Sequence, residues 1–257
     1  MLLALDIGKH NITLGVFDDE RLVATWRLST DHAKMPDEYS IMLTQLLHLR
    51  GMSVNDVDAV ALCSVVPPLT PTFVELCRRF FGVEPLVVGA GTRTGIRILY
   101  DNPRDVGADR IVDAAAPAMR LYGGPVIVVD RGTATVIDAV TAGGDYLGGA
   151  ITPGMTIAHD ALFSNTSQLR RVELVSPETA IGRNTIHAIQ AGIVLGYADL
   201  VRGMVGRFDR ELGGGAKVVA TGGMAHIIEK EAGVFDDVNP DLTLTGLRLI
   251  HEMALSS

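Results

Sequence analysis

The stretch LLALDIG, residues 2–8, recurs in the second half of the chain as VIVVDRG, residues 126–132. Each is a short apolar run ending in an aspartate with a glycine two positions later, which predicts a buried strand followed by a sharp turn. In both halves two further strand patterns follow at once, and the second half gives them at 135–140 and 146–151. The repetition predicts a duplicated fold made of two similar α/β lobes.

The rest of the chain continues this β-β-β-α-β-α-β order. The first half gives strands at 11–16 and 22–28, a helix opened by Pro36 and closed by Gly51, a strand at 59–63, a helix at 71–81 ended by Gly82, and a strand at 86–88. The second half gives a long helix at 185–212, with glycines that suit close packing, a strand at 218–220, and helices from Met224 and at 244–254. We expect lobes at 1–115 and 116–257, joined by a helix that carries Pro117, each with a mixed five-stranded sheet.

Composition excludes several classes of protein. Of the 257 residues 47% are hydrophobic, and the net charge of −8 disfavours binding to the nucleic-acid backbone. Asp6 interrupts the first apolar run, and no long uncharged apolar segment follows, so we expect a cytoplasmic protein that does not span a membrane. Cys63 and Cys77 are the only cysteines, and we interpret both as reduced residues of the core.

Three glycine turns at strand ends favour an ATP site. In Asp6–Thr13 the backbone N–H groups of a hairpin can face a triphosphate, Gly8 permits close approach, and Asp6 can hold a water bound to Mg²⁺. A single Asp-x-Gly is equally a tight turn with a capping aspartate. The second copy, Asp130–Thr135, and the TGG turn at 221–223 favour the nucleotide interpretation.

The segment between the two halves offers acceptor chemistry. Tyr100 lies shortly before Gly107-Ala108-Asp109-Arg110, a turn that leads into a helix. Asp109 is a candidate general base and Arg110 a candidate anion clamp, although an acid beside a base at a helix start is also an ordinary cap and surface ion pair. The GGAITPG turn at 148–154 either shapes an acceptor pocket or is a bare loop.

Taken together, these motifs resemble a known family. The chain carries D-x-G near its start, DNPxxVGADR at 101–110, DxGTAT at 130–135, GGAIxPG at 148–154, IGxNT at 181–185 and TGG at 221–223. In their order and spacing these motifs resemble those of type III pantothenate kinases. That family belongs to the actin-like ATPase superfamily, whose members have ribonuclease H-like lobes. The resemblance implies phosphorylation of pantothenate by ATP, the first step of coenzyme A synthesis, with Mg²⁺ and a monovalent cation, K⁺ or NH₄⁺. It also implies a homodimer.

The resemblance assigns roles to individual residues. ATP contacts are implied for Asp6, Ile7, Gly8, Lys9, His10, Asn11, Ile12, Thr13, Thr133, Gly222 and Gly223. Pantothenate contacts are implied for Tyr100, Gly107, Ala108, Asp109, Arg110 and Thr185, with Asp109 as the proton acceptor. Metal contacts are implied for Asp6 and, for the monovalent cation, Asp130.

Four residues depart from the family pattern. Lys9 and His10 replace a small polar pair in the first loop, Arg131 stands where an apolar residue is usual, and Val136 where threonine is frequent. Strand alternation predicts that Arg131 points away from Asp130. A working kinase and a catalytically impaired, ligand-binding or regulatory paralogue therefore both stay open, and a kinase of the same superfamily with another hydroxylated acid as acceptor is a third alternative.

Overall fold

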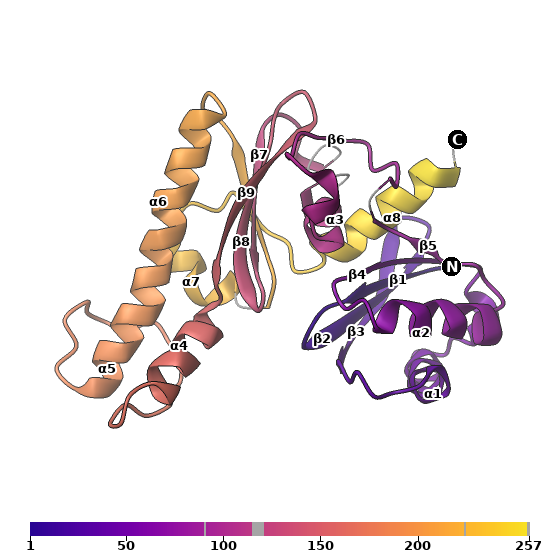
Figure 1. Cartoon of the computed structure of the whole chain (residues 1–257), viewed down its shortest axis with the longest axis horizontal. Helices are drawn as coiled ribbons and strands as arrows, with labels where there is room; N and C mark the ends of the chain where they lie inside the picture. The colour runs from indigo at the N-terminus through magenta and orange to yellow at the C-terminus, as the bar shows by residue number, and fades with distance from the viewer. Residues whose placement is uncertain (90, 115–120, 224, 256–257) are drawn as a thin grey trace. The chain divides into compact units, whose positions relative to one another are not determined.

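The computed structural model describes residues 1–89, 91–114, 121–223 and 225–255 (Figure 1). The chain divides into two compact units. Unit 1 contains Met1–Ile96, Asp101–Pro117 and Leu242–Ser257, and unit 2 contains Arg97–Tyr100 and Ala118–Asp241. Each unit holds one β-sheet.

Unit 1 is built on a mixed five-stranded sheet, as predicted. Its strands are β1 (Leu2–Ile7), β2 (Asn11–Asp18), β3 (Arg21–Ser29), β4 (Ala59–Ser64) and β5 (Leu86–Val87). They lie in the order β3-β2-β1-β4-β5, with β1 antiparallel to β2 and parallel to β4. The central strand β1 is therefore enclosed by neighbours on both edges.

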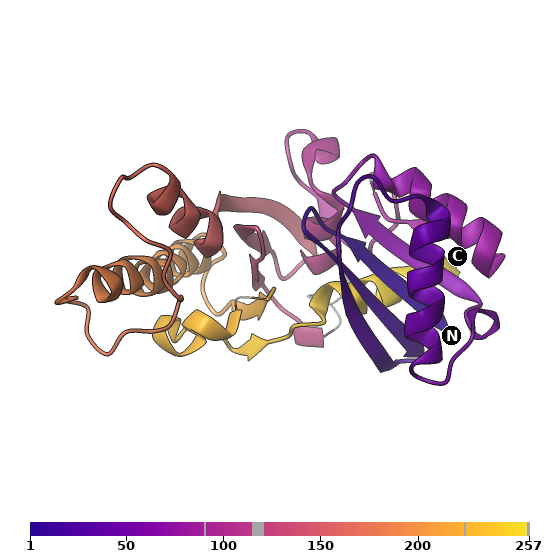
Figure 2. The ribbon, with the colours of Figure 1, turned by 90° about the horizontal axis from the view of Figure 1, so that it is seen from below.

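Helices cover both faces of this sheet (Figures 1 and 2). They are α1 (Pro36–His48), η1 (Val54–Asp56), α2 (Leu69–Leu76) with its continuation η2 (Cys77–Phe81), η3 (Pro103–Asp105), α3 (Ala108–Ala114) and α8 (Leu242–Leu255). Gly82 ends the helical run of α2 and η2 in the left-handed conformation, φ 67°, as its position predicts. Alternation along β1 sends Leu3 and Leu5 into the core under α1 and α2, and Leu2 and Ala4 into the core under α3 and α8.

Unit 2 repeats this sheet and adds one strand. Its strands are β6 (Arg97–Ile98), β7 (Val126–Arg131), β8 (Ala134–Val140), β9 (Asp145–Pro153), β10 (Lys217–Thr221) and β11 (Asp237–Val238). Their order is β11-β10-β7-β8-β9-β6. Without β6, the order β9-β8-β7-β10-β11 matches the order β3-β2-β1-β4-β5 of unit 1. The expected count of five was wrong for this sheet because the two-residue β6 pairs with β9, beside an Arg97–Asp145 ion pair at 2.8 Å. Two residues are too few to show a strand period.

The helices of unit 2 include one long stretch. They are α4 (Met155–Ser164), α5 (Thr185–Gln190), η5 (Ala191–Leu195), α6 (Gly196–Glu211) and α7 (Ala225–Ala232). The helical run over Thr185–Glu211 is, in the described part of the chain, the only helix long and apolar enough to cross a membrane, and 44% of its apolar window is buried. A core helix of a soluble protein has these same properties.

The glycines of this run do not mark close packing. A Cβ placed on Gly192, Gly196 or Gly203 would meet no heavy atom of the described residues within 4 Å. Within the described chain these three glycines are therefore not points of close helix approach, and the alternative expectation of close approach by a ligand stays a prediction. The helix packs through its larger side chains, including Val194 and Val201, which are fully buried in the core of unit 2.

The last helix belongs to the first sheet. Leu244, Leu247 and Ile250 of α8 are buried with Leu2 and Phe17 in one cluster of unit 1. Residues 242–257 thus group with unit 1, whereas the sequence-based division placed them in a lobe at 116–257. The linking helix expected around Pro117 lies outside the described residues.

We predict that Leu247→Ala lowers the free energy of unfolding by about 2–5 kcal/mol, because the side chain is fully buried between α8 and the sheet of unit 1. Leu255→Ala on the same helix is the matched control, since Leu255 is 75% exposed. Urea denaturation measures both. Equal stabilities for the two variants would contradict the placement of α8 in the core of unit 1.

Candidate active site

The hairpin that joins β1 to β2 is as tight as its sequence predicts. Gly8 N–H donates to the carbonyl of Asn11 at 3.0 Å, and a Cβ on Gly8 would lie 2.9 Å from that same oxygen. Lys9 and His10 form the exposed tip. Thr30, just after β3, ties the hairpin down by donating its hydroxyl to the Gly8 carbonyl at 2.6 Å and its N–H to the His10 carbonyl at 3.0 Å.

Asp6 lies at the end of β1 on the face covered by α3 and α8. It pairs in register with Cys63 of β4, and the Cys63 thiol donates to Asp6 Oδ1 at 3.5 Å. Burial raises the pKa of Cys63 well above its usual value, which keeps this thiol protonated and able to donate. The pKa of Asp6 is raised to about 7, chiefly by burial and in addition by the charge of Asp109, against the lowering effect of the thiol hydrogen bond.

Asp109 reaches the same region from the first turn of α3. Its Oδ1 accepts the N–H of Arg110 at 2.8 Å, and a Cβ on Gly107 would lie 2.5 Å from that oxygen, so glycine is needed beneath the carboxylate. Burial raises the pKa of Asp109, while the N–H and charge of Arg110 lower it. Arg110 is itself buried, which rules out the ordinary surface ion pair as an account of these two residues.

In unit 2 the second loop packs against two glycines. Gly222 has φ +86°, and a Cβ there would lie 2.6 Å from Asp130 Oδ1 and 2.7 Å from the backbone of Arg131. Gly154 N–H donates to the carbonyl of Thr133 at 3.0 Å, and a Cβ on Gly154 would lie 2.3 Å from that oxygen. The structure therefore brings Asp130, Thr133 and Gly222 together, and adds Gly154, which sequence reasoning had placed only in a turn beside the acceptor.

Arg131 points away from Asp130, as strand alternation predicts. Its side chain is buried in unit 2, and Nη2 donates to the sulfur of Met155 at 3.2 Å. Burial lowers the pKa of Arg131 to about 10, against the opposing effect of the Asp130 charge. The unusual arginine thus lies in the core on the far face of β7, and the unusual Val136 is likewise buried.

Of the residues predicted to contact pantothenate, Tyr100 and Thr185 belong to unit 2, where they lie at two separate places. The ring of Tyr100 lies 6.4 Å from that of Tyr146, centroid to centroid, and packs over Gly148. Thr185 is exposed at the start of α5, where Asn184 caps the helix by accepting the N–H of His187 at 2.9 Å. Gly107, Ala108, Asp109 and Arg110 lie in unit 1.

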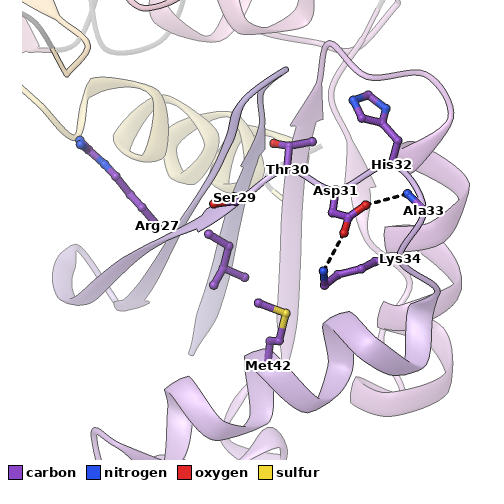
Figure 3. A pocket seen from close by; sticks show the side chains of 9 residues that line it. Arg27, Ser29, Thr30, Asp31, His32, Ala33, Lys34 and Met42 are labelled. Carbon is purple, nitrogen blue, oxygen red and sulfur yellow. Dashed lines mark hydrogen bonds and ion pairs between the residues drawn. The ribbon is translucent and has the colours of Figure 1, made fainter.

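A groove beside the first hairpin was missed by sequence reasoning (Figure 3). It encloses about 750 Å³ along the end of β3 and the start of α1, and is lined by Arg27, Leu28, Ser29, Thr30, Asp31, His32, Ala33, Lys34 and Met42. Asp31 pairs with Lys34 at 2.8 Å and accepts the N–H of Ala33, while Arg27 points away from this pair. The hydrogen bonds of Thr30 to the hairpin connect this wall to the first loop.

The residues at the first loop fit a magnesium ion brought by a nucleotide. Among the described residues, no group of three or more histidine, cysteine or acidic side chains could hold a metal by itself. Magnesium in phosphotransfer sites is bound by one or two carboxylates together with substrate phosphates. Asp6 and Asp109, two carboxylates of unit 1 of which the second raises the pKa of the first, would supply that kind of donor set.

We predict that Asp6→Asn stabilises the unliganded protein above neutral pH. The pKa of Asp6 rises from 3.8 to about 7 on folding, so the folded state binds the extra proton. The free energy of unfolding therefore falls as pH rises from about 4 to about 7, by up to about 4 kcal/mol. Thermal melts across this range should be flatter for Asp6→Asn than for the parent. Asp18→Asn, an exposed aspartate of β2, serves as the control, and parallel profiles for both variants would refute the prediction.

Comparisons with known proteins agree on a family. The family model of type III pantothenate kinase matches residues 2–207. The chain is 52% identical to a type III pantothenate kinase of Roseiflexus sp. (strain RS-1), over 98% of this chain and 99% of the relative. It is 50% identical to one of Moorella thermoacetica, over the same shares of the two chains.

Solved structures share the fold at low identity. The activator of 2-hydroxyisocaproyl-CoA dehydratase from Clostridium difficile, solved with bound ADPNP, superposes with a TM-score of 0.55 at 14% identity, over 99% of this chain and 96% of that one. The ROK hexokinase of Thermus thermophilus gives a TM-score of 0.51 at 14% identity, over 99% of both chains. This chain therefore has the fold of these two proteins, and by its sequence it belongs to the type III pantothenate kinase family.

Proposed function

We propose that this protein phosphorylates pantothenate with ATP to give 4′-phosphopantothenate, the first step of coenzyme A synthesis. Membership of the type III pantothenate kinase family supports the reaction. The observation in this chain that supports the proposal is that the charge of Asp109 acts on the carboxylate of Asp6, which lies one residue before the end of the strand leading into the first hairpin. Phosphoryl transfer needs this combination of charge and positioning.

ATP binding is assigned to the two strand-end loops. In unit 1 the backbone of Asp6 to Thr13 supplies N–H groups, and in unit 2 Thr133, Gly222 and Gly223 supply a hydroxyl and open backbone. Asp6 would hold Mg²⁺, and Asp130 a monovalent cation, K⁺ or NH₄⁺. Bound Mg²⁺ would offset the negative charge of the phosphates.

Pantothenate binding is assigned to Tyr100, Gly107, Ala108, Asp109, Arg110 and Thr185. Arg110 would pair with the carboxylate of pantothenate through its planar guanidinium group. Asp109 would accept the proton of the primary hydroxyl as that oxygen forms a bond to the γ-phosphorus and the bond to ADP breaks. Burial, which raises the pKa of Asp109, suits it to this role because a general base works best with a pKa near the operating pH.

The unusual loop residues are compatible with activity. Lys9 and His10 are exposed at the hairpin tip, and neither is packed into the core of unit 1. Arg131 is buried on the opposite face of β7 from Asp130. None of these positions favours the impaired paralogue over a working kinase.

We further propose a cytoplasmic homodimer that binds neither nucleic acid nor membrane. Unit 2 exposes a series of large apolar side chains between β9 and α5, as a protein–protein interface would. They are Ile151, Ile157, Phe163, Val175, Ile181 and Ile186. The net charge of −8 supports the absence of nucleic acid.

Asp109→Asn should lower kcat by about 10²–10⁴-fold, the usual scale for loss of a general base. The assay is coupled ADP release with pantothenate, Mg²⁺ and K⁺. Asp105→Asn is the matched control, because Asp105 is exposed four positions earlier and its hydrogen bond from Asn102 tolerates an amide. An Asp109→Asn variant that keeps full turnover would exclude Asp109 as the base, and one that fails to fold would favour the capping role.

The parent protein should turn over at millimolar ATP, and Lys9→Asn with His10→Thr should change the KM for ATP by less than about tenfold, because both side chains are exposed at the hairpin tip. The same ADP-release assay measures this. An inactive parent whose activity is restored by the double substitution would instead identify an impaired paralogue.

A further inference from the structure

Close to Tyr100 lies a buried pair that takes no part in the proposed reaction. Tyr146 of β9 is fully buried, Asp138 of β8 is 3% exposed, and the Tyr146 hydroxyl donates to Asp138 Oδ1 at 2.8 Å. A hydrogen bond to a buried acidic group is among the stronger ones in proteins. Tyr146 is therefore held in one orientation.

Tyr146 in turn holds the segment that carries Tyr100. Its backbone pairs with Ile98 of β6, and its carbonyl accepts the N–H of Leu99 at 2.8 Å, one residue before Tyr100. Its ring also faces that of Tyr100, tilted at 39° with centroids 6.4 Å apart. Both the backbone and the ring of Tyr100 are thus positioned from Tyr146.

Two glycines of β9 make room for this arrangement. Gly148 has φ +103°, and a Cβ there would lie 2.8 Å from Cε2 of Tyr100. A Cβ on Gly149 would lie 2.5 Å from Asp138 Oδ1 and 1.9 Å from the carbonyl of Ile137. Gly148 therefore sets how closely the Tyr100 ring approaches the sheet, and Gly149 leaves space for the carboxylate.

We propose that Asp138 and Tyr146 are positioning residues for Tyr100, and that Gly148 fixes the depth of its ring, so that the three together determine the affinity for the acceptor. The proposal rests on the proposed function, which assigns Tyr100 to pantothenate. It predicts an effect on acceptor binding alone. None of the three residues needs to touch pantothenate for this to hold.

The test is Tyr146→Phe, which keeps the ring and removes the hydroxyl. We expect the KM for pantothenate to rise about tenfold, the equivalent of one hydrogen bond, with kcat and the KM for ATP within about twofold of the parent. Calorimetric titration with pantothenate should show the same loss. Gly148→Ala should give the same pattern, and it carries the test if Tyr146→Phe does not fold.

Tyr39→Phe is the matched control. Tyr39 is also fully buried, and its hydroxyl donates to the Asp31 carbonyl at 2.9 Å, but it lies in unit 1 against Phe73. It should lower the melting temperature as Tyr146→Phe does while leaving the KM for pantothenate unchanged. Equal KM values for the two variants would overturn the proposal.

A double-mutant cycle with Tyr100→Ala separates positioning from general damage. If Tyr146 acts through Tyr100, Tyr146→Phe should no longer change the KM for pantothenate once Tyr100 is alanine, and a tenfold effect that persists there would refute the mechanism. An unchanged KM in Tyr100→Ala itself would overturn the proposal together with the assignment of Tyr100. Turnover of pantothenate by the parent protein tests the proposed reaction independently.

Discussion

The parallel pairing of each central strand with its neighbour determines what lies beside the aspartate at the end of that strand. In unit 1 the register of β1 and β4 sets Asp6 beside Cys63, and in unit 2 the register of β7 and β10 sets Asp130 beside Thr221, one residue before the glycine that contacts it. Because side chains alternate along a strand, a slip of one residue would send Asp6 into the apolar core under α1 and α2. The hydrophobic alternation of β1 therefore specifies the position of the carboxylate as well as the core.

This placement has an energetic cost. A carboxylate whose pKa is about 7 in the folded protein is less stable as an anion there than in water, and the nearby Asp109 adds to that cost. The surrounding packing must offset it, and the fully buried side chains on both faces of the sheet, with α8 closing one of them, supply the apolar burial. A buried carboxylate of this kind is suited to a ligand that carries positive charge, because binding would offset the repulsion between Asp6 and Asp109.

The sequence predicted what depends on local pattern and missed what depends on long-range contact. Residues 2–8 and 126–132 show the duplicated strand and turn directly, and alternation correctly turned Arg131 away from Asp130. The strand β6 escaped prediction because its two residues carry no period and only the pairing with β9 defines them. The Cys63 thiol was interpreted as packing alone, since nothing in its local sequence indicates a neighbour fifty-seven residues away. Close helix approach at the glycines of the long helix was not found within the described chain, because composition does not show which face meets another element.

Duplication gave the two units one topology, and the differences between them divide the chemistry. In unit 1 the aspartate at the end of the central strand accepts a hydrogen bond from a neutral thiol and is acted on by the charge of a second carboxylate, the surroundings that the proposed divalent ion and general base would use. In unit 2 the equivalent aspartate lies against glycine backbone, and the arginine after it is buried on the opposite face. Close backbone beside the Asp130 carboxylate is the setting in which we propose a monovalent cation and the polar edges of a nucleotide to bind. The same residue at the same strand end thus lies in two different surroundings, because its neighbours differ between the units.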